Sequence, residues 1–120
     1  MLNGQSILVI EEEFLVALDI QRILESAEAG QLVFARSVAE AHDFSARWPE
    51  FSMAIISMGA QQDGAIALAQ ALSAQQTALV LTTTVPPQTG LPGLDGAAMV
   101  AKPFAEDELL TACASALERR

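Results

Sequence analysis

Residues 52–59 read SMAIISMG, a short apolar run that ends close to a serine. Residues 53–56 are continuously apolar, as expected for a strand whose two faces are both covered by helices. We therefore predict a buried, central strand at 53–56, with Ser57 at its carboxyl end. What Ser57 does there depends on the residues that the rest of the chain places around it.

Further strands are predicted on both sides of this run, and they alternate with helices. Ser37 and Glu40 have the spacing of a capping box, which marks a helix start. Strands that alternate with helices imply right-handed crossovers and a parallel, doubly wound α/β sheet. We predict one domain over residues 1–120, because a chain of this length has little room for a second. The predicted strands are 6–10, 32–35, 53–56, 78–81 and 97–101, and the predicted helices are 14–27, 38–48, 65–74 and 105–119.

The interval between the fourth and fifth strands interrupts this alternation. Residues 82–96 read TTTVPPQTGLPGLDG, which contains three prolines and three glycines. Proline and glycine are the poorest helix formers. The fourth helix is therefore predicted to be short or missing.

Charge and composition exclude several classes of function. Six basic and fifteen acidic residues give a net charge of −9, which repels a polyanion and argues against direct nucleic-acid binding. No apolar run approaches the roughly 20 residues of a membrane span. The N-terminus lacks the pattern of a secretory leader, and the single Cys113 cannot form an internal disulfide. We expect a cytoplasmic protein without membrane contact.

Polar side chains follow the predicted strands at their carboxyl ends, where ligands bind in open parallel sheets. Carboxylates, hydroxyls and a lysine that meet at one edge suit a hard cation and a phosphate. The residues concerned are Glu11, Glu12 and Glu13 after the first strand, Ser57 after the third, Thr82 to Thr84 after the fourth, and Lys102 with Pro103 after the fifth.

In order and spacing, ILVIEEEFLVALD (7–19), the third strand, LTT (81–83) and AKPF (101–104) resemble the CheY-like receiver domain of bacterial response regulators. The resemblance covers practically the whole chain. It implies a flavodoxin-like (βα)5 fold of five parallel strands and a role in two-component or phosphorelay signal transduction. In that family an acidic pair helps to bind magnesium, and an aspartate after the third strand accepts a phosphoryl group from a histidine kinase. A hydroxyl and a lysine contact that group.

The resemblance assigns roles to individual residues of this chain. Ser57 falls on the phosphoacceptor aspartate, and Met99 falls where the family often has an aromatic residue that changes rotamer on activation. A cis peptide bond before Pro103 is also implied. The remaining matches are Glu11 and Glu12 for the acidic pair, Thr82 for the hydroxyl, Lys102 for the lysine, and Gly59 for the carbonyl that completes the metal shell.

These substitutions predict a degenerate phosphoacceptor pocket. The Ser57 hydroxyl lacks the charge of a carboxylate and removes one ligand from a near-octahedral magnesium shell. Glu12 is one methylene longer than the family's usual aspartate, so Glu12 and Gly59 are only weak metal candidates. We expect no cofactor, with Mg²⁺ bound at most weakly, and a structural ion pair between Lys102 and a glutamate.

The leading hypothesis is a pseudo-receiver that acts by protein–protein contact without aspartyl phosphorylation. Its partner would be a signalling protein or an output domain, and a homodimer is a further option. Val85, Leu91 and Leu94 are the candidate partner surface. No nucleophile and base pair can be named, so an enzyme is not expected.

Two further hypotheses remain open. One is a phosphorylation-dependent regulator with another acceptor, for which Asp63 is the only nearby aspartate after the third strand. The second is a flavodoxin-like small-molecule binder, although no glycine-rich phosphate loop follows the first strand.

Overall fold

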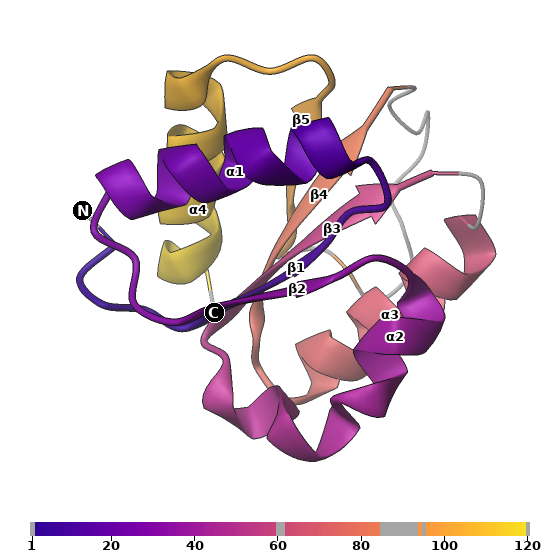
Figure 1. Ribbon diagram of the computed structural model, residues 1–120. Helices are drawn as coiled ribbons and strands as arrows, with labels where there is room; N and C mark the ends of the chain where they lie inside the picture. Colours follow the sequence, from indigo (N-terminus) through magenta and orange to yellow (C-terminus); the bar gives the residue numbers. More distant parts are fainter. Residues whose placement is uncertain (1, 60–61, 85–93, 95, 120) are drawn as a thin grey trace.

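A five-stranded parallel sheet forms the centre of the molecule, with helices on both faces (Figure 1). The computed structural model describes residues 2–59, 62–84, 94 and 96–119. The strand order is β2-β1-β3-β4-β5, so the chain winds outward from β1 in both directions. The doubly wound fold predicted from the sequence is confirmed. The strands are β1 (Ile7–Ile10), β2 (Leu32–Ala35), β3 (Met53–Met58), β4 (Ala78–Thr83) and β5 (Ala98–Ala101).

The helices divide into two layers. On one face lie α1 (Phe14–Ser26) and α4 (Glu106–Glu118). On the other lie α2 (Val38–Asp43), the 3-10 helix η1 (Ser45–Glu50) and α3 (Gln62–Ala74). Both faces of β3 are therefore covered, which explains its continuously apolar sequence.

The second predicted helix, 38–48, is divided into α2 and η1. The carbonyl oxygen of Ala41 accepts the backbone N–H of Phe44 at 3.1 Å and the indole N–H of Trp48 at 3.0 Å. Both donors direct their hydrogens to this one carbonyl, so the α-helical ladder does not continue past it. The chain proceeds as a 3-10 turn that contains Pro49, which has no N–H to donate.

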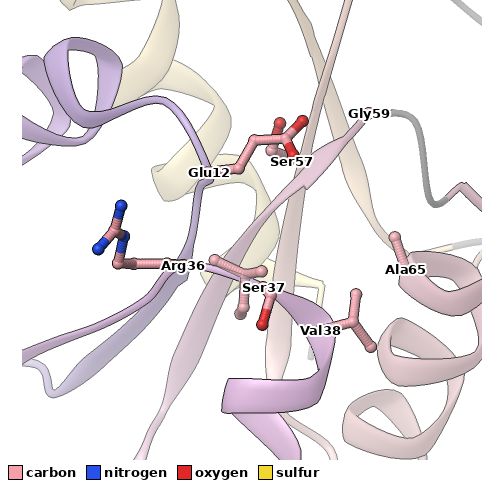
Figure 2. Close-up of a pocket in the computed structure, with 8 residues that line it drawn as sticks. Glu12, Arg36, Ser37, Val38, Ser57, Gly59 and Ala65 are labelled. Carbon is pink, nitrogen blue, oxygen red and sulfur yellow. The ribbon is translucent and has the colours of Figure 1, made fainter.

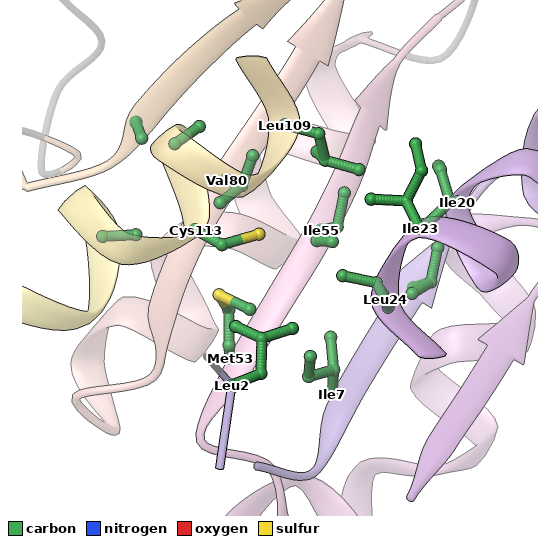
Figure 3. Packing of buried hydrophobic residues seen from close by; sticks show 14 of the residues in the cluster. Leu2, Ile7, Ile20, Ile23, Leu24, Met53, Ile55, Val80, Leu109 and Cys113 are labelled. Atoms are coloured by element: carbon green, nitrogen blue, oxygen red, sulfur yellow. The ribbon is translucent and has the colours of Figure 1, made fainter. Parts of the chain in front are cut away.

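Two apolar clusters hold the layers together. Figure 3 shows the cluster between the sheet and the α1/α4 layer, where Ile55 and Val80 meet Leu109 and Cys113. Cys113 is fully buried there and packs among apolar side chains. The cluster on the opposite face includes Leu8, Ile56, Leu68 and Trp48. Successive residues of β1 to β4 thus alternate between the two clusters, whereas in β5 only Ala98 and Val100 belong to a cluster.

The predicted short or missing fourth helix falls on residues 85–93 and 95, which lie outside the described residues. Leu94 is described, and it is buried in the cluster of the α2/α3 face. Within the described part of the chain, no helix combines the length and the apolar character that a membrane crossing requires.

Candidate functional site

The carboxyl ends of β1, β3, β4 and β5 meet at one edge of the sheet. In the β3–β4 ladder Ser57 pairs with Thr82, and in the β4–β5 ladder Thr82 pairs with Val100. Ser57 and Thr82 continue the alternation of Ile55 and Val80, whose side chains face the α1/α4 layer. The edge of that face is therefore where the predicted pocket residues can meet.

Lys102 follows β5 and connects it to the carboxyl ends of β1 and β3. Its Nζ donates to Ser57 Oγ at 2.6 Å and to Glu11 Oε1 at 2.9 Å. The side chains of Lys102 and Glu11 are 13% and 1% exposed, so this ion pair is shielded from solvent. We call the three side chains of Glu11, Ser57 and Lys102 the Lys102 bridge. The ion pair predicted between Lys102 and a glutamate is confirmed, with Glu11 as the partner.

The second oxygen of Glu11 is also engaged. Glu11 Oε2 accepts the backbone N–H of Glu13 at 3.0 Å, which holds the turn between β1 and α1. Charge-assisted hydrogen bonds of this kind are stronger than neutral ones. Both oxygens of the buried carboxylate therefore have partners within the protein.

Thr82 lies beside the bridge without joining it. Its side chain is fully buried, and its Oγ1 has no hydrogen-bond partner among the described residues. An unpaired buried hydroxyl costs roughly 1–3 kcal/mol. Thr82 thus lies beside Ser57 in the β3–β4 ladder, and its hydroxyl has no partner among the described residues.

Glu12 does not join the Lys102 bridge. It lies beside Ser57 in a separate cavity. Figure 2 shows its carboxylate close to Ser57 and Gly59, in a small cavity of about 60 Å³ that Val38 and Ala65 also line. A Cβ atom placed on Gly59 would lie 2.8 Å from Glu12 Oε1, so a larger residue there would make this exposed side chain shift. The two glutamates of the acidic pair therefore differ. Glu11 is buried in an ion pair with Lys102, and Glu12 is exposed.

The oxygen atoms at this edge differ in whether they are already bonded within the protein. Glu11 and Ser57 are already bonded to Lys102, which leaves the Glu12 carboxylate and the Gly59 carbonyl as candidate donors. Among the residues that the structure describes, no three His, Cys, Asp or Glu side chains form a group that could hold a metal. Mg²⁺ prefers near-ideal octahedral coordination by oxygen, and its weak binding at this edge stays a prediction.

The remaining predicted residues lie apart from the bridge. Met99 is 41% exposed on β5, between the buried Ala98 and Val100, so it belongs to the opposite face from those two. Asp63 is exposed in the first turn of α3. The peptide bond between Lys102 and Pro103 is cis, as the resemblance implied.

The predicted partner surface is wrong at Leu94. Leu94 is only 6% exposed and packs in the cluster of the α2/α3 face, so it contributes to the core rather than to a surface. An isolated leucine among turn residues gains more from burial than from exposure to water. Val85 and Leu91 lie outside the described residues.

α1 carries an exposed apolar surface that includes none of the predicted site residues. Phe14, Leu15 and Leu18 are 69%, 78% and 45% exposed, and we call them the α1 patch. At 3.6 residues per turn, they form an arc opposite the buried Ile20, Ile23 and Leu24. On a helical wheel, α1 therefore has two apolar arcs. One arc packs on the sheet, and the other is exposed.

Comparison with solved structures identifies the fold. A response regulator from Thermotoga maritima matches with a TM-score of 0.78 and 16% identity, covering 96% of this chain and 98% of that one. The signal receiver domain of an HD domain-containing protein from Pseudomonas fluorescens Pf-5 matches with a TM-score of 0.77, 24% identity and coverages of 95% and 94%.

A third match comes from a larger protein. A mutant of the anti-anti-sigma factor PhyR from Bartonella quintana matches with a TM-score of 0.77 and 22% identity, covering 96% of this chain and 49% of that one. No family model and no curated protein matches the sequence. The chain thus has the fold of the response regulator receiver domains, with a serine and a buried ion pair at the edge where the candidate site residues meet.

Proposed function

We propose that this protein is an atypical receiver domain of two-component or phosphorelay signalling, and that it acts through protein contact without aspartyl phosphorylation. The observation that carries this proposal is the contact between Ser57 Oγ and Lys102 Nζ at 2.6 Å. The position that matches the family's acceptor carries a hydroxyl, and that hydroxyl is already bonded.

The chemistry of the bridge argues against phosphoryl transfer to Ser57. The Lys102 ammonium is a hydrogen-bond donor only, so it draws on a lone pair of the serine oxygen. A serine nucleophile is weak unless an adjacent base removes its proton, and the neighbour here is an ammonium held by a carboxylate. A phosphoserine would also be a stable ester, unlike the labile acyl phosphate of an aspartate, and would not reset quickly.

Phosphorylation at Asp63 and small-molecule binding both have less support. Asp63 is exposed at the start of α3, whereas the Lys102 ammonium is bonded to Glu11 and Ser57. The cavity beside Ser57 measures about 60 Å³, whereas sites for small ligands usually measure about 300–1,000 Å³. The cavity beside Ser57 therefore lacks the space for a flavodoxin-like ligand.

Similar structures support a partner protein. One neighbour is the receiver domain of an HD domain-containing protein, and PhyR, of which the chain spans 49%, is described as an anti-anti-sigma factor. We propose by analogy that a signalling protein or an output domain binds this chain in the cytoplasm. The net charge of −9 argues against nucleic acid as the direct partner. Self-association is the second possible assembly.

The test is incubation with acetyl phosphate and Mg²⁺, followed by intact-mass spectrometry. We expect no gain of a phosphoryl group, and we expect the amide NMR spectrum to stay unchanged. Ser57→Ala and Asp63→Asn are the matched controls that locate any modification. A phosphoryl group at substantial occupancy, lost in either variant, would refute the proposal and identify the acceptor.

A further inference from the structure

A tight turn before β1 carries Asn3, the only asparagine in the sequence, followed directly by Gly4. Both residues have a positive φ, 52° for Asn3 and 76° for Gly4. The backbone N–H of Gln5 donates to the carbonyl oxygen of Leu2 at 3.0 Å and closes the turn. Two positive φ values with such a bond define a type I′ turn, for which Asn-Gly is a preferred pair. This sequence is therefore what the backbone of the turn requires.

The turn is held in place by the connection between α1 and β2. The backbone N–H of Gly4 donates to the carbonyl oxygen of Glu28 at 3.0 Å, and the carbonyl oxygen of Gln5 accepts the N–H of Gly30 at 2.9 Å. Leu2, at the start of the turn, is 1% exposed and packs in the cluster between the sheet and the α1/α4 layer (Figure 3). One buried side chain thus anchors an otherwise superficial segment.

Asn3 and Gly4 also form a chemically reactive pair. The backbone nitrogen of Gly4 can attack Cγ of Asn3, because glycine has no side chain to obstruct the approach. The new N–Cγ bond forms as the Cγ–Nδ2 bond breaks, the Gly4 nitrogen loses its proton to solvent, and ammonia leaves. Water then opens the resulting succinimide at either of its two carbonyls, which gives aspartate or isoaspartate. The reaction consumes one water and needs no oxidant or reductant.

The folded turn opposes this attack. A residue in the left-handed region has a ψ of about +47°, which places the next backbone nitrogen on the opposite side of the Cα–C bond from Cβ. Attack on Cγ requires the nitrogen and the side chain to lie on the same side. The peptide plane between Asn3 and Gly4 must therefore rotate, and this rotation breaks the bond from Gly4 to Glu28 and the bond that closes the turn.

Local opening is the easiest route to this rotation. It exposes Leu2 and breaks a few hydrogen bonds, but it leaves the five-stranded sheet and both helical layers intact. Segments with few buried contacts open at a lower free energy than the whole domain unfolds. Asn3 is exposed, so water reaches the site. The reaction therefore follows the opening of the turn rather than global unfolding.

We propose that Asn3 is a deamidation site, with water as its co-reactant, and that local opening of the turn formed by residues 2–5 sets its rate. The two products differ in their effect on the fold. Aspartate leaves the backbone unchanged, and Asp-Gly also suits a type I′ turn. Isoaspartate adds one carbon to the main chain, so Leu2 and Gly4 can no longer both keep their places. This product irreversibly releases the segment before β1.

The rate is measured on the full chain, folded in buffer and unfolded in guanidinium chloride, at pH 8 and 37 °C. Peptide mapping by mass spectrometry separates Asn3, aspartate and isoaspartate at this position. We expect Asn3 to react at least about tenfold more slowly in the folded chain, because its turn is closed most of the time. Amide exchange of Gly4, followed by NMR, measures the opening independently.

A pair of core substitutions separates local from global opening. Leu2→Ala removes the anchor of the turn, whereas Leu68→Ala removes a buried leucine from the cluster of the opposite face. Both lose the contacts of one core leucine, but only Leu2→Ala should speed deamidation and Gly4 exchange in the folded chain, by at least about threefold. In guanidinium chloride both should react like wild type. Circular dichroism checks that each variant is folded.

A second variant displaces the turn from the other side. A Cβ on Gly30 would collide with the carbonyl group of Gly4, so Gly30→Ala should also speed the reaction in the folded chain. The products are compared after separation of the aged protein by ion exchange. The isoaspartate form should unfold at a lower temperature than Asn3→Asp, which has the same charge and an unaltered main chain.

Four outcomes would overturn the inference. They are equal rates in the folded and unfolded chain, a folded rate that Leu2→Ala and Gly30→Ala leave unchanged, an equal acceleration by Leu68→Ala, and an isoaspartate form as stable as Asn3→Asp. None of these outcomes involves Ser57 or its phosphorylation, so the inference and the proposed function stand or fall separately.

Discussion

Lys102 Nζ lies 2.6 Å from Ser57 Oγ, although 45 residues separate them along the chain. The same ammonium lies 2.9 Å from Glu11 Oε1, so one side chain connects the carboxyl ends of β1, β3 and β5. Edge strand β5 is thereby tied to the centre of the sheet through side chains as well as through its ladder with β4. The bridge is therefore a structural element of the sheet that lies at the candidate site.

The first prediction concerns the loss of the bridging cation. Lys102→Met should lower the free energy of unfolding by about 3 kcal/mol, because it leaves the 1% exposed Glu11 carboxylate without its counter-ion. Urea unfolding at neutral pH measures the change. Glu11→Gln/Lys102→Met, which removes both charges, should be less destabilised than the sum of the single variants. Additive single effects would show that the ion pair contributes no coupling.

The second prediction restores a carboxylate at the acceptor position. Ser57→Asp should fold, but in chelator it should be less stable than wild type by roughly 1 kcal/mol, a typical effect of one substitution. The reason is that the new carboxylate joins those of Glu11 and Glu12, so that three negative charges surround the single ammonium of Lys102. Mg²⁺ should recover that stability. Thermal unfolding measures both states, and Ser57→Asn, without the charge, should not respond to Mg²⁺. Equal stability of Ser57→Asp in both solutions would contradict this account.

Much of the fold could be predicted because apolar runs and turn residues carry the signal locally. β2 has the predicted bounds, and every other described strand overlaps its prediction. β3 and β4 each extend two residues further, through Ser57 and Thr82, because the ladder between them continues past the apolar run. Hydroxyl side chains do not stop a strand, so its end is set by pairing rather than by hydrophobicity.

The site was only partly predictable, for a physical reason in each case. That Glu11, Ser57 and Lys102 converge follows from the parallel sheet, whose strand ends share one edge. Which glutamate would pair with Lys102 depends on backbone direction after β1, which buries Glu11 and exposes Glu12. The burial of Leu94 depends on contacts with residues distant in sequence. A local sequence pattern shows neither the backbone direction after β1 nor the distant contacts of Leu94.

The third prediction follows from the buried position of Leu94. Leu94→Ser should lower the free energy of unfolding by about 3 kcal/mol, because it removes apolar contacts and places a hydroxyl in the core. Leu18→Ser, at a position 45% exposed on α1, is the control and should change stability by less than about 0.5 kcal/mol. Chemical denaturation compares them. A Leu94→Ser variant as stable as the control would return Leu94 to the surface.

The fourth prediction contrasts two glycines. A Cβ on Gly30 would collide with the backbone carbonyl of Gly4, which cannot move aside as a side chain can, so Gly30→Ala should cost about 2 kcal/mol. Gly64 lies in α3, and a Cβ there would meet Val38 Cγ1 at an ordinary 3.7 Å. Gly64→Ala should therefore stabilise the protein by about 0.5–1 kcal/mol. Opposite signs in thermal unfolding are expected, and equal effects would be inconsistent with the packing at Gly30.

The fifth prediction uses the buried thiol of Cys113. Burial raises the pKa of Cys113 from 9.0 to about 12, because the thiolate cannot be solvated in the core. The folded protein thus keeps the proton that the unfolded chain loses first. This contribution to stability is complete below about pH 9 and is lost as the pH rises toward 12, by about 1.4 kcal/mol per pH unit. Urea unfolding between pH 8 and higher values should therefore show a steeper decline for wild type than for Cys113→Ala, in which the thiol is gone. Identical slopes would mean that the thiol ionises as readily in the folded protein as in the unfolded chain, and a thiol reagent would then label native protein rapidly at pH 8.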